Sequence, residues 1–305
     1  MMDIRLPELI DWSGISEAQR EKALCRPPIP SGNFQQVVGE IISHVRRDGD
    51  AALHELCEKY DGVTLAQLEV TAEEWALAES RVDPLVLQAM DEAIERISAF
   101  HISGKPRPVS METSPGLLCE ARYLPISPVG LYVPGGSAPL ISTVIMLGVP
   151  AQIAACEQVV LCTPPDRQGQ VSPAILAAAS RCGIKRVFKV GGAQAIAAMG
   201  LGTDSIPACA KLFGPGNAWV TEAKQQISAL PGGAARDMPA GPSEVLVIAD
   251  DGADATAVCW DLLSQAEHGP DSQAIVISDS QRLLDEVGRR LPSMASELPR
   301  ADILA

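Results

Sequence analysis

Residues 186–200 read RVFKVGGAQAIAAMG, an apolar stretch followed by two glycines and an Ala-rich stretch with helical spacing. This order predicts a buried β-strand, a tight turn and an α-helix. The same order returns in AKLFGPGNAWVTEAKQQI, residues 210–227, and in SEVLVIADDGADATAVCWDLLSQAEHG, residues 243–269. Strands that alternate with helices indicate a mostly parallel sheet, with ligand-binding loops at the carboxyl ends of its strands. The stretch therefore predicts an α/β fold.

The rest of the chain extends this pattern and adds a helical segment. Strand, turn and helix signals recur over residues 158–183, whereas residues 107–131 carry β-formers broken by Pro and predict short strands. Residues 34–106 have the apolar spacing of amphipathic helices. We expect two domains with mostly parallel, incomplete Rossmann-like sheets and a helical N-terminal segment.

The expected domain boundaries follow from these changes of pattern. Residues 1–24 form an N-terminal arm ahead of the Pro-rich RPPIPSG. Residues 25–131 together with 245–305 form a first, discontinuous domain, and residues 132–244 form a second domain inserted into it. We expect the active cleft to lie between the two. The last residues, ELPRADILA, are amphipathic helix sequence without a cap or Gly stop, so we expect that the chain is cut short.

The composition excludes several classes of protein. Of the 305 residues, 47% are hydrophobic, which excludes a disordered chain, and only 4% are aromatic, so Ala, Val, Leu and Ile must fill the core. The formal net charge is −14, and no Lys/Arg cluster interrupts this acidity. Nucleic acids and anionic membranes need a basic footprint, so neither is an expected partner. This acidic balance of charges indicates a soluble cytoplasmic protein with a small substrate.

The eight cysteines form no C-x-x-C pair and are scattered through core-like segments. This distribution favours reduced, buried thiols, and a catalytic Cys is the alternative. The N-terminus has no signal-peptide layout, and no apolar stretch reaches transmembrane length without Pro, Gly or charge. We therefore expect a cytoplasmic location.

Four loops between a strand and the next element could bind a ligand. YVPGGSAP begins at Tyr132, Gln194 follows the glycine pair of VGGAQAIAA, Asn217 follows the rigid FGPG, and Ser243 lies in DMPAGPSEVLVIAD. Glycines allow close backbone approach, and the helices that follow offer free N–H groups to an anion. Tight turns and an Asn N-cap explain the same residues without a ligand. No loop has the G-x-G-x-x-G, P-loop or G-x-S-x-G pattern.

The segment SQAEHGPDSQ, residues 264–273, carries a possible metal site. Gln265 and His268 are three residues apart near a predicted helix end, so both face one side of its last turn. An amide oxygen and an imidazole nitrogen can both bind Zn²⁺. A His that caps a helix C-terminus is the alternative. The remaining histidines, His44, His54 and His101, lie in helical patterns and do not complete a zinc site.

Taken together, these motifs resemble the histidinol dehydrogenase family. The matching stretches are GLYVPGGSAPLISTVIMLGVPA, VGGAQAIAAM, FGPGNAWVTEAK, DMPAGPSEVLVIAD and DLLSQAEHGPDSQ, and the N-terminal helices are similar too. The resemblance covers essentially the whole chain. It implies a zinc- and NAD-dependent oxidation of L-histidinol to L-histidine through the aldehyde, with two hydrides passed in turn to two NAD⁺.

The resemblance also implies roles for single residues. Gln265 and His268 are implied zinc ligands that also contact the substrate, and Ser243 is an implied substrate contact. Three residues are implied NAD contacts: Tyr132, Gln194 and Asn217. The family implies one zinc ion per subunit of a homodimer whose C-terminal segments interleave.

The chain departs from the family in one respect. The family's acid/base pair, an adjacent Glu-His in a GPEHL-like motif, does not occur here, and EHGP at residues 267–270 is a different motif. A later zinc-binding Asp, and a zinc-binding His that reaches across from the partner subunit, are missing as well. We therefore expect no catalytic acid/base residue in this chain, weak or absent zinc binding, and little or no activity of this polypeptide by itself.

Two alternatives stay open. The chain could be an α/β module that binds NAD or another ligand without chemistry of its own, which the incomplete catalytic set favours. It could also be a family relative that oxidises another amino alcohol or a sulfonate alcohol, because the residues that distinguish an imidazole are not identified in this sequence.

Overall fold

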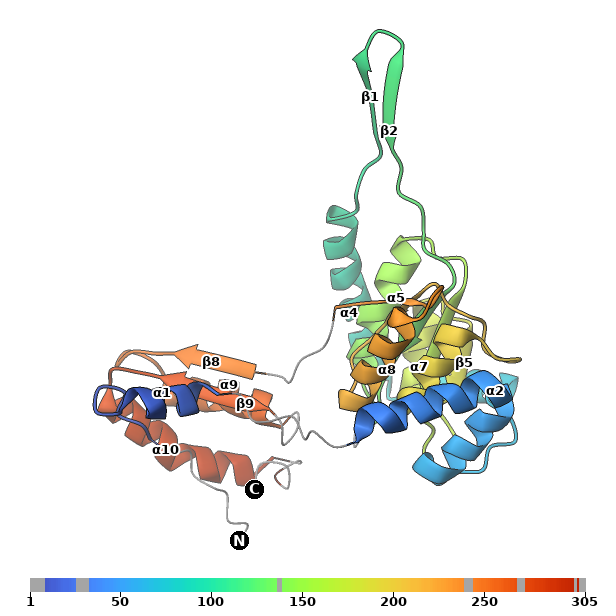
Figure 1. The fold of residues 1–305 in the computed structure, drawn as a ribbon. Coiled ribbons are helices and arrows are strands. Elements are labelled where there is room, and N and C mark those ends of the chain that lie inside the picture. Colours follow the sequence, from blue (N-terminus) through green and yellow to red (C-terminus); the bar gives the residue numbers. More distant parts are fainter. Residues whose placement is uncertain are drawn as a thin grey trace. The chain divides into compact units, whose positions relative to one another are not determined.

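In a computed structural model of the protein, the strands that the sequence predicts are paired in three sheets (Figure 1). The structure describes residues 9–25, 33–135, 139–238, 244–267, 272–298 and 301. The chain divides into two compact units, Gly32–Ala240 and Met1–Ser31 with Gly241–Ala305. Among the described residues, every helix is too short or too polar to span a bilayer.

A five-stranded parallel sheet lies at the centre of the larger unit, in the order β5-β4-β3-β6-β7. Its strands are β3 (Val129–Tyr132), β4 (Val159–Thr163), β5 (Arg186–Lys189), β6 (Lys211–Phe213) and β7 (Ala235–Arg236). From β3 the chain builds β4 and β5 on one side and then crosses to β6 and β7 on the other. Ligands of such sheets bind outside the carboxyl ends of the strands, where the strand order reverses.

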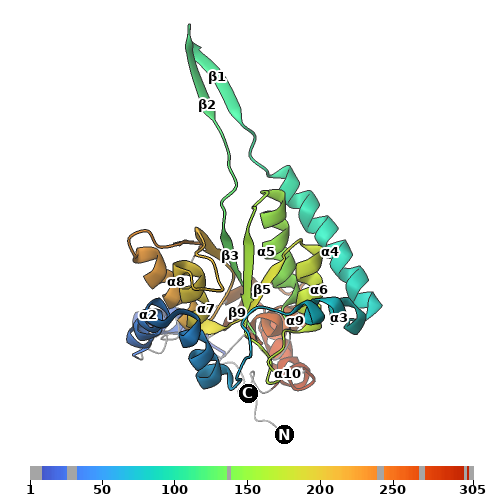
Figure 2. The ribbon, with the colours of Figure 1, turned by 90° about the vertical axis from the view of Figure 1, so that its right-hand side faces the viewer.

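Helices cover both faces of this sheet. Figure 2 shows α2, α7 and α8 on one side and α4, α5 and α6 on the other. Their bounds are α2 (Phe34–Asp61), α4 (Pro84–Ser103), α5 (Ile141–Ile153), α6 (Pro173–Arg181), α7 (Gly192–Leu201) and α8 (Ala218–Ala229). Alternate strand residues enter separate cores: Cys162 and Phe188 pack with α2 and α7, and Leu161 and Val187 pack with α5 and α6. Such two-sided burial is typical of parallel sheets and confirms the predicted fold class.

The helical N-terminal segment belongs to this larger unit. Its short helices α3 (Ala72–Ala78) and η1 (Glu79–Arg81) pack on α6. The backbone ahead of α3 pairs with β5, because Val70 N–H donates to Val187 O at 2.9 Å and Lys189 N–H donates to Leu68 O at 2.8 Å. This pairing covers an edge of the sheet that would otherwise stay open.

The units divide the chain at other places than the expected domains. The expected first domain joins residues 25–131 to residues 245–305, whereas the structure groups residues 32–131 with the five-stranded sheet. The physical reason is a shared core: α2 buries Val38, Ile42 and Leu53 in the cluster that also contains α7 and α8.

The predicted short strands of residues 107–131 are present. Besides β3, they are β1 (Val109–Ser114) and β2 (Leu117–Ala121), which pair antiparallel around a turn with Gly116 at φ 79°. Every residue of these two strands is exposed.

The smaller unit is built on one parallel strand pair, β8 (Glu244–Ile248) and β9 (Gln273–Ile277). Its helices are α1 (Glu17–Leu24), α9 (Ala255–Ala266) and α10 (Gln281–Ser296). Apolar residues of α9 and α10, among them Cys259, Leu262 and Leu283, form its core with partly buried residues of both strands. The core fixes α9, the helix whose last turn carries Gln265.

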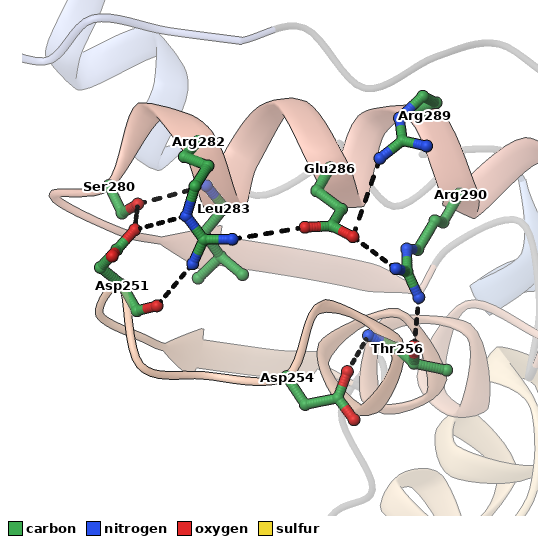
Figure 3. Close-up of polar contacts among 9 residues, drawn as sticks. All are labelled: Asp251, Asp254, Thr256, Ser280, Arg282, Leu283, Glu286, Arg289 and Arg290. Carbon is green, nitrogen blue, oxygen red and sulfur yellow. Dashed lines mark hydrogen bonds and ion pairs between the residues drawn. The ribbon is translucent and has the colours of Figure 1, made fainter.

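Polar contacts fasten the start of α10 to the loop before α9 (Figure 3). Ser280 caps α10 by accepting a hydrogen bond from Leu283 N–H at 3.2 Å, and its hydroxyl donates to Asp251 Oδ1 at 2.6 Å. Arg282 donates to the same oxygen at 2.9 Å. The Ser280 hydroxyl and then the Arg282 guanidinium hold the pKa of Asp251 below its usual value.

We expect Asp251→Asn to speed amide exchange in α10 at neutral pH. A carboxyl whose pKa is lowered in the folded state stabilises that state above its unfolded pKa of about 4, and this stabilisation is lost as pH falls through the folded pKa. The difference from the unmodified protein should therefore shrink towards pH 3. Hydrogen exchange followed by mass spectrometry measures it. Asp279→Asn, at a neighbouring exposed carboxylate, is the control and should change little. An effect independent of pH would contradict the ionic origin.

Candidate functional site

A cavity of about 600 Å³ lies at the carboxyl ends of β3, β4, β5 and β6. All its described lining residues belong to the larger unit: Asp61, Tyr132, Pro134, Gly135, Pro139, Thr163, Pro164, Pro165, Asp166, Gln170, Val171, Ser172, Ile175, Gly192 and Asn217. Most come from the turns that leave the strands. The cavity thus occupies the position at which parallel α/β sheets bind ligands.

Tyr132 is the last residue of β3, and its side chain connects the turn after β3 to the turn after β5. Its side chain is buried, and its hydroxyl oxygen accepts a hydrogen bond from Gly192 N–H at 3.0 Å, at the first residue of α7. Burial is the main cause that raises the pKa of Tyr132 to about 12. The hydroxyl therefore keeps its proton at neutral pH and can donate a hydrogen bond.

Glycines let the turns approach one another closely. A Cβ atom at Gly135 would lie 2.4 Å from Pro164 Cγ, and one at Gly191 would lie 2.6 Å from Pro164 Cβ. Both separations are well below van der Waals contact, so any side chain at either glycine would push Pro164 away. The loops after β3, β4 and β5 pack as one layer because two of them lack side chains there.

The turn after β6 is fixed by a buried ion pair. Gly214 has φ 126°, and a Cβ atom there would lie 2.0 Å from Tyr132 O. Lys224 Nζ donates to Gly214 O at 2.5 Å and to Asp237 Oδ1 at 2.7 Å, while Asp237 Oδ2 accepts from Gly214 N–H at 2.8 Å. Burial lowers the pKa of Lys224, and the hydrogen bond to Asp237 opposes this. Both backbone groups of Gly214 are thereby held in place.

The structure brings two of the three expected NAD contacts to the cavity. Tyr132 and Asn217 line it. Asn217 is also the N-cap of α8, because its Oδ1 accepts a hydrogen bond from Val220 N–H at 3.2 Å. The N-cap alternative considered for Asn217 is therefore confirmed as well. Gln194 is buried in the first turn of α7, where its Oε1 would lie 2.9 Å from a Cβ atom at Gly192, and it is outside the lining.

Of the expected zinc and substrate contacts, Gln265 is described, whereas Ser243 and His268 lie outside the described residues. Gln265 lies in the last turn of α9, and its Nε2 is buried without a hydrogen-bond partner in the described chain. A buried amide without a partner suits a ligand contact, and the side-chain oxygen of Gln is a rare but competent zinc donor. A cleft between the domains stays a prediction.

The described residues do not assemble a complete metal site. They contain no group of three or more His, Cys, Asp or Glu side chains that could hold a metal ion. His44 lies in α2, with its Nε2 at 3.3 Å from carboxylate oxygens of Asp48 and Glu55, and His54 and His101 lie in α2 and α4. Support for a zinc ion therefore rests only on the donor chemistry of Gln265 and His268.

These loops have counterparts in known proteins. A model of the family described as histidinol dehydrogenase matches residues 25–305. The chain belongs to the histidinol dehydrogenase family. The resemblance drawn from the motifs is thus confirmed, and with it membership of a family of oxidoreductases.

Relatives of this family match over nearly the whole chain. Histidinol dehydrogenase of Xanthomonas euvesicatoria pv. vesicatoria is 54% identical over 297 residues, 97% of this chain and 69% of that protein. The Vibrio cholerae enzyme of the same name is 52% identical over 293 residues, 96% of this chain and 67% of that protein. A crystal structure of histidinol dehydrogenase from Elizabethkingia anophelis superimposes with a TM-score of 0.88 at 42% identity, covering 95% of this chain and 66% of that one. The chain spans about two thirds of the length of the relatives it matches.

Two parts of the lining, the loop after β4 and the end of α2, were not among the loops singled out from the sequence. Pro164 follows β4 directly, and a Pro pair after a buried strand is a signal that could have identified this loop. Asp61 comes from the end of α2, a helix that precedes the sheet in the chain. No local pattern indicates that it meets the loops.

We expect Gly214→Ala to destabilise the protein by about 3 kcal/mol or more, because the new methyl group meets the Tyr132 carbonyl and the backbone keeps a positive φ. Urea unfolding measures the change. The matched control is Gly232→Ala, also at positive φ (72°) but with nothing within 4 Å of the new Cβ. It should cost only about 1 kcal/mol. Equal costs for the two variants would show that the contact with Tyr132 does not constrain the turn.

Proposed function

We propose that the larger unit binds NAD in the cavity at the carboxyl ends of β3 to β6. The convergence of four glycine- and proline-bearing turns at the strand-order reversal of a parallel sheet carries this proposal. Parallel α/β sheets bind nucleotides at this place because helix N-termini and close backbone approach favour phosphate groups.

The lining combines apolar walls with a few polar groups, as small-molecule sites do. Pro164, Val171 and Ile175 provide apolar surface for a flat ring. Tyr132 offers a hydroxyl proton, and the Asn217 amide offers a donor group, because only its oxygen is used by the helix cap among the described residues. Gln194 is buried in the first turn of α7, close to Gly192, and belongs to the same proposed set.

The family indicates the reaction of the whole protein. We infer that it oxidises L-histidinol to L-histidine through the aldehyde, in the cytoplasm and as a homodimer. NAD supplies the hydride acceptor for both oxidations, and zinc, when bound, supplies a Lewis acid for the substrate oxygen. Gln265 and His268 would hold the zinc ion and contact the substrate, and Ser243 would bind the substrate. The buried Gln265 Nε2, which has no hydrogen-bond partner among the described residues, supports the substrate contact, because this group can only donate hydrogen bonds.

A binding module without chemistry is the second candidate. The described lining of the cavity contains no histidine, and the chain has no GPEHL-like pair, so binding groups are present without an identified acid/base pair. A relative that oxidises another amino alcohol or a sulfonate alcohol would share the same NAD cavity. Titration with different alcohols distinguishes these candidates.

We expect Asn217→Asp to weaken NAD binding by about tenfold or more while leaving the stability nearly unchanged, because Asp caps helices as well as Asn but brings a negative charge to the cavity. Isothermal titration with NAD measures the affinity, and thermal unfolding measures the stability. Asn217→Ser keeps a capping oxygen without the charge and should weaken binding less. NAD affinity unchanged in Asn217→Asp would remove this cavity as the nucleotide site.

We expect the 305-residue polypeptide to bind NAD yet form little or no NADH from histidinol, with or without added zinc, because it lacks an identified acid/base pair. Absorbance at the NADH band measures turnover, and titration on the same sample measures binding. Rapid NADH formation would refute the expected inactivity. Failure to bind NAD would instead refute the cavity assignment.

A further inference from the structure

Asp61 occupies an unexpected place on the cavity. It is the last residue of α2, and the helix ends there because Gly62 adopts φ 68°. The body of α2 is anchored in the core with α7 and α8 through Leu53, Leu56 and Cys57. Asp61 is thereby held rigidly against the carboxyl edge of the sheet, where it lines the cavity with Tyr132 and Gly192.

This placement is unfavourable for the folded state. Asp61 Oδ2 is buried and has no hydrogen-bond partner among the described residues, which also show no ion pair to this carboxylate. The negative charge stands at a helix C-terminus, where the helix dipole repels it. Burial raises the pKa of Asp61, and the neighbouring Cys57 thiol offsets the rise only in part.

The neighbours of Asp61 do not compensate its charge. Burial raises the pKa of Cys57 to about 12, so this thiol is neutral at physiological pH. The Tyr132 hydroxyl is neutral as well, and the Asp61 charge is one of the causes that raise its pKa. The other carboxylate of the lining, Asp166, stabilises the turn in which it lies, because its Oδ1 accepts hydrogen bonds from Gln168 N–H and Gln170 N–H at 2.9 Å each. Asp61 is therefore the lining carboxylate whose Oδ2 has no hydrogen-bond partner among the described residues, although the Cys57 thiol lies within hydrogen-bonding reach of the carboxyl group.

An uncompensated carboxylate on a cavity is best explained by a ligand that donates hydrogen bonds to it. Buried polar groups are normally satisfied, and exceptions concentrate at functional sites. In nucleotide-binding α/β sheets an acidic side chain accepts hydrogen bonds from ribose hydroxyls. A phosphate at the same point would be repelled by the like charge.

The geometry points to Asp61 as the residue of this cavity that accepts hydrogen bonds from a ribose diol of the bound dinucleotide. This inference rests on the proposed NAD site and adds a residue that determines which nucleotide enters it. The diol can belong to the adenosine or to the nicotinamide half. A phosphate on the adenosine 2′ position, as in NADP, distinguishes the two.

The test compares Asp61→Asn with Asp204→Asn, a matched loss of charge at an exposed aspartate of the same unit that lies outside the cavity lining. Titration of each variant with NAD and NADP gives the affinities, and thermal unfolding reports the fold. Asp61→Asn should weaken NAD binding about tenfold, as loss of a charge-assisted hydrogen bond does. It should leave the thermal midpoint equal or raise it, because the change removes an uncompensated charge. Asp204→Asn should leave NAD affinity within about twofold.

The comparison of NAD with NADP shows which ribose of the dinucleotide Asp61 contacts. If Asp61 binds the adenosine ribose, Asp61→Asn narrows the preference for NAD over NADP. If it binds the nicotinamide ribose, both affinities fall by the same factor. Unchanged NAD affinity in Asp61→Asn, or a weakened affinity with a lower thermal midpoint, overturns the inference and leaves the NAD site standing. Failure of the unmodified protein to bind NAD overturns both.

Discussion

The close packing of glycine backbone against neighbouring turns at the carboxyl edge of the sheet is the constraint on which the site depends. Gly214 lies so near the Tyr132 carbonyl that no side chain fits, and Gly135 and Gly191 enclose Pro164 in the same way. Because the backbone of these glycines touches the Tyr132 main chain and the rigid Pro164 ring, the approach of the turns is set largely by covalent geometry and hydrogen bonds. A site of this kind is formed before its ligand arrives, which reduces the entropic cost of binding.

Buried charges in the larger unit separate into two groups. Lys224 with Asp237, and Lys189 with Glu74, are ion pairs that fasten a turn or a helix start to the sheet. Removing one partner would leave the other charge uncompensated, so these pairs belong to the fold. Asp61 has no such partner among the described residues, and the amide of Gln265 in the smaller unit likewise stands unpartnered. The fold explains the first group, and a bound ligand is the explanation that we propose for the second.

Local patterns in the sequence account for much of this arrangement. The strand-glycine-helix order of residues 186–200 predicted β5, its turn and α7, and the same order predicted β6 and α8. Tyr132 and Asn217 each stand beside such a turn, which periodicity and glycine indicate directly, and the family resemblance implied their role as NAD contacts. In a parallel sheet, residues that follow successive strands converge at one edge. A sequence pattern can therefore place several loops at one site without knowing any distance.

What the sequence could not predict depends on packing between distant segments. Nothing near Asp61 indicates that α2 lies against α7 and α8, because its amphipathic face would suit any apolar surface. For the same reason the N-terminal helices were expected with residues 245–305, whereas the structure groups them with the five-stranded sheet. For Gln194, the sequence predicted the helical position but not the surroundings of the side chain. Its position in the first turn of α7 was predicted, but its burial beside Gly192 depends on φ 63° at that glycine, which no residue pattern specifies. Periodicity determines which face of an element is apolar, and tertiary contacts determine which polar side chain reaches the cavity.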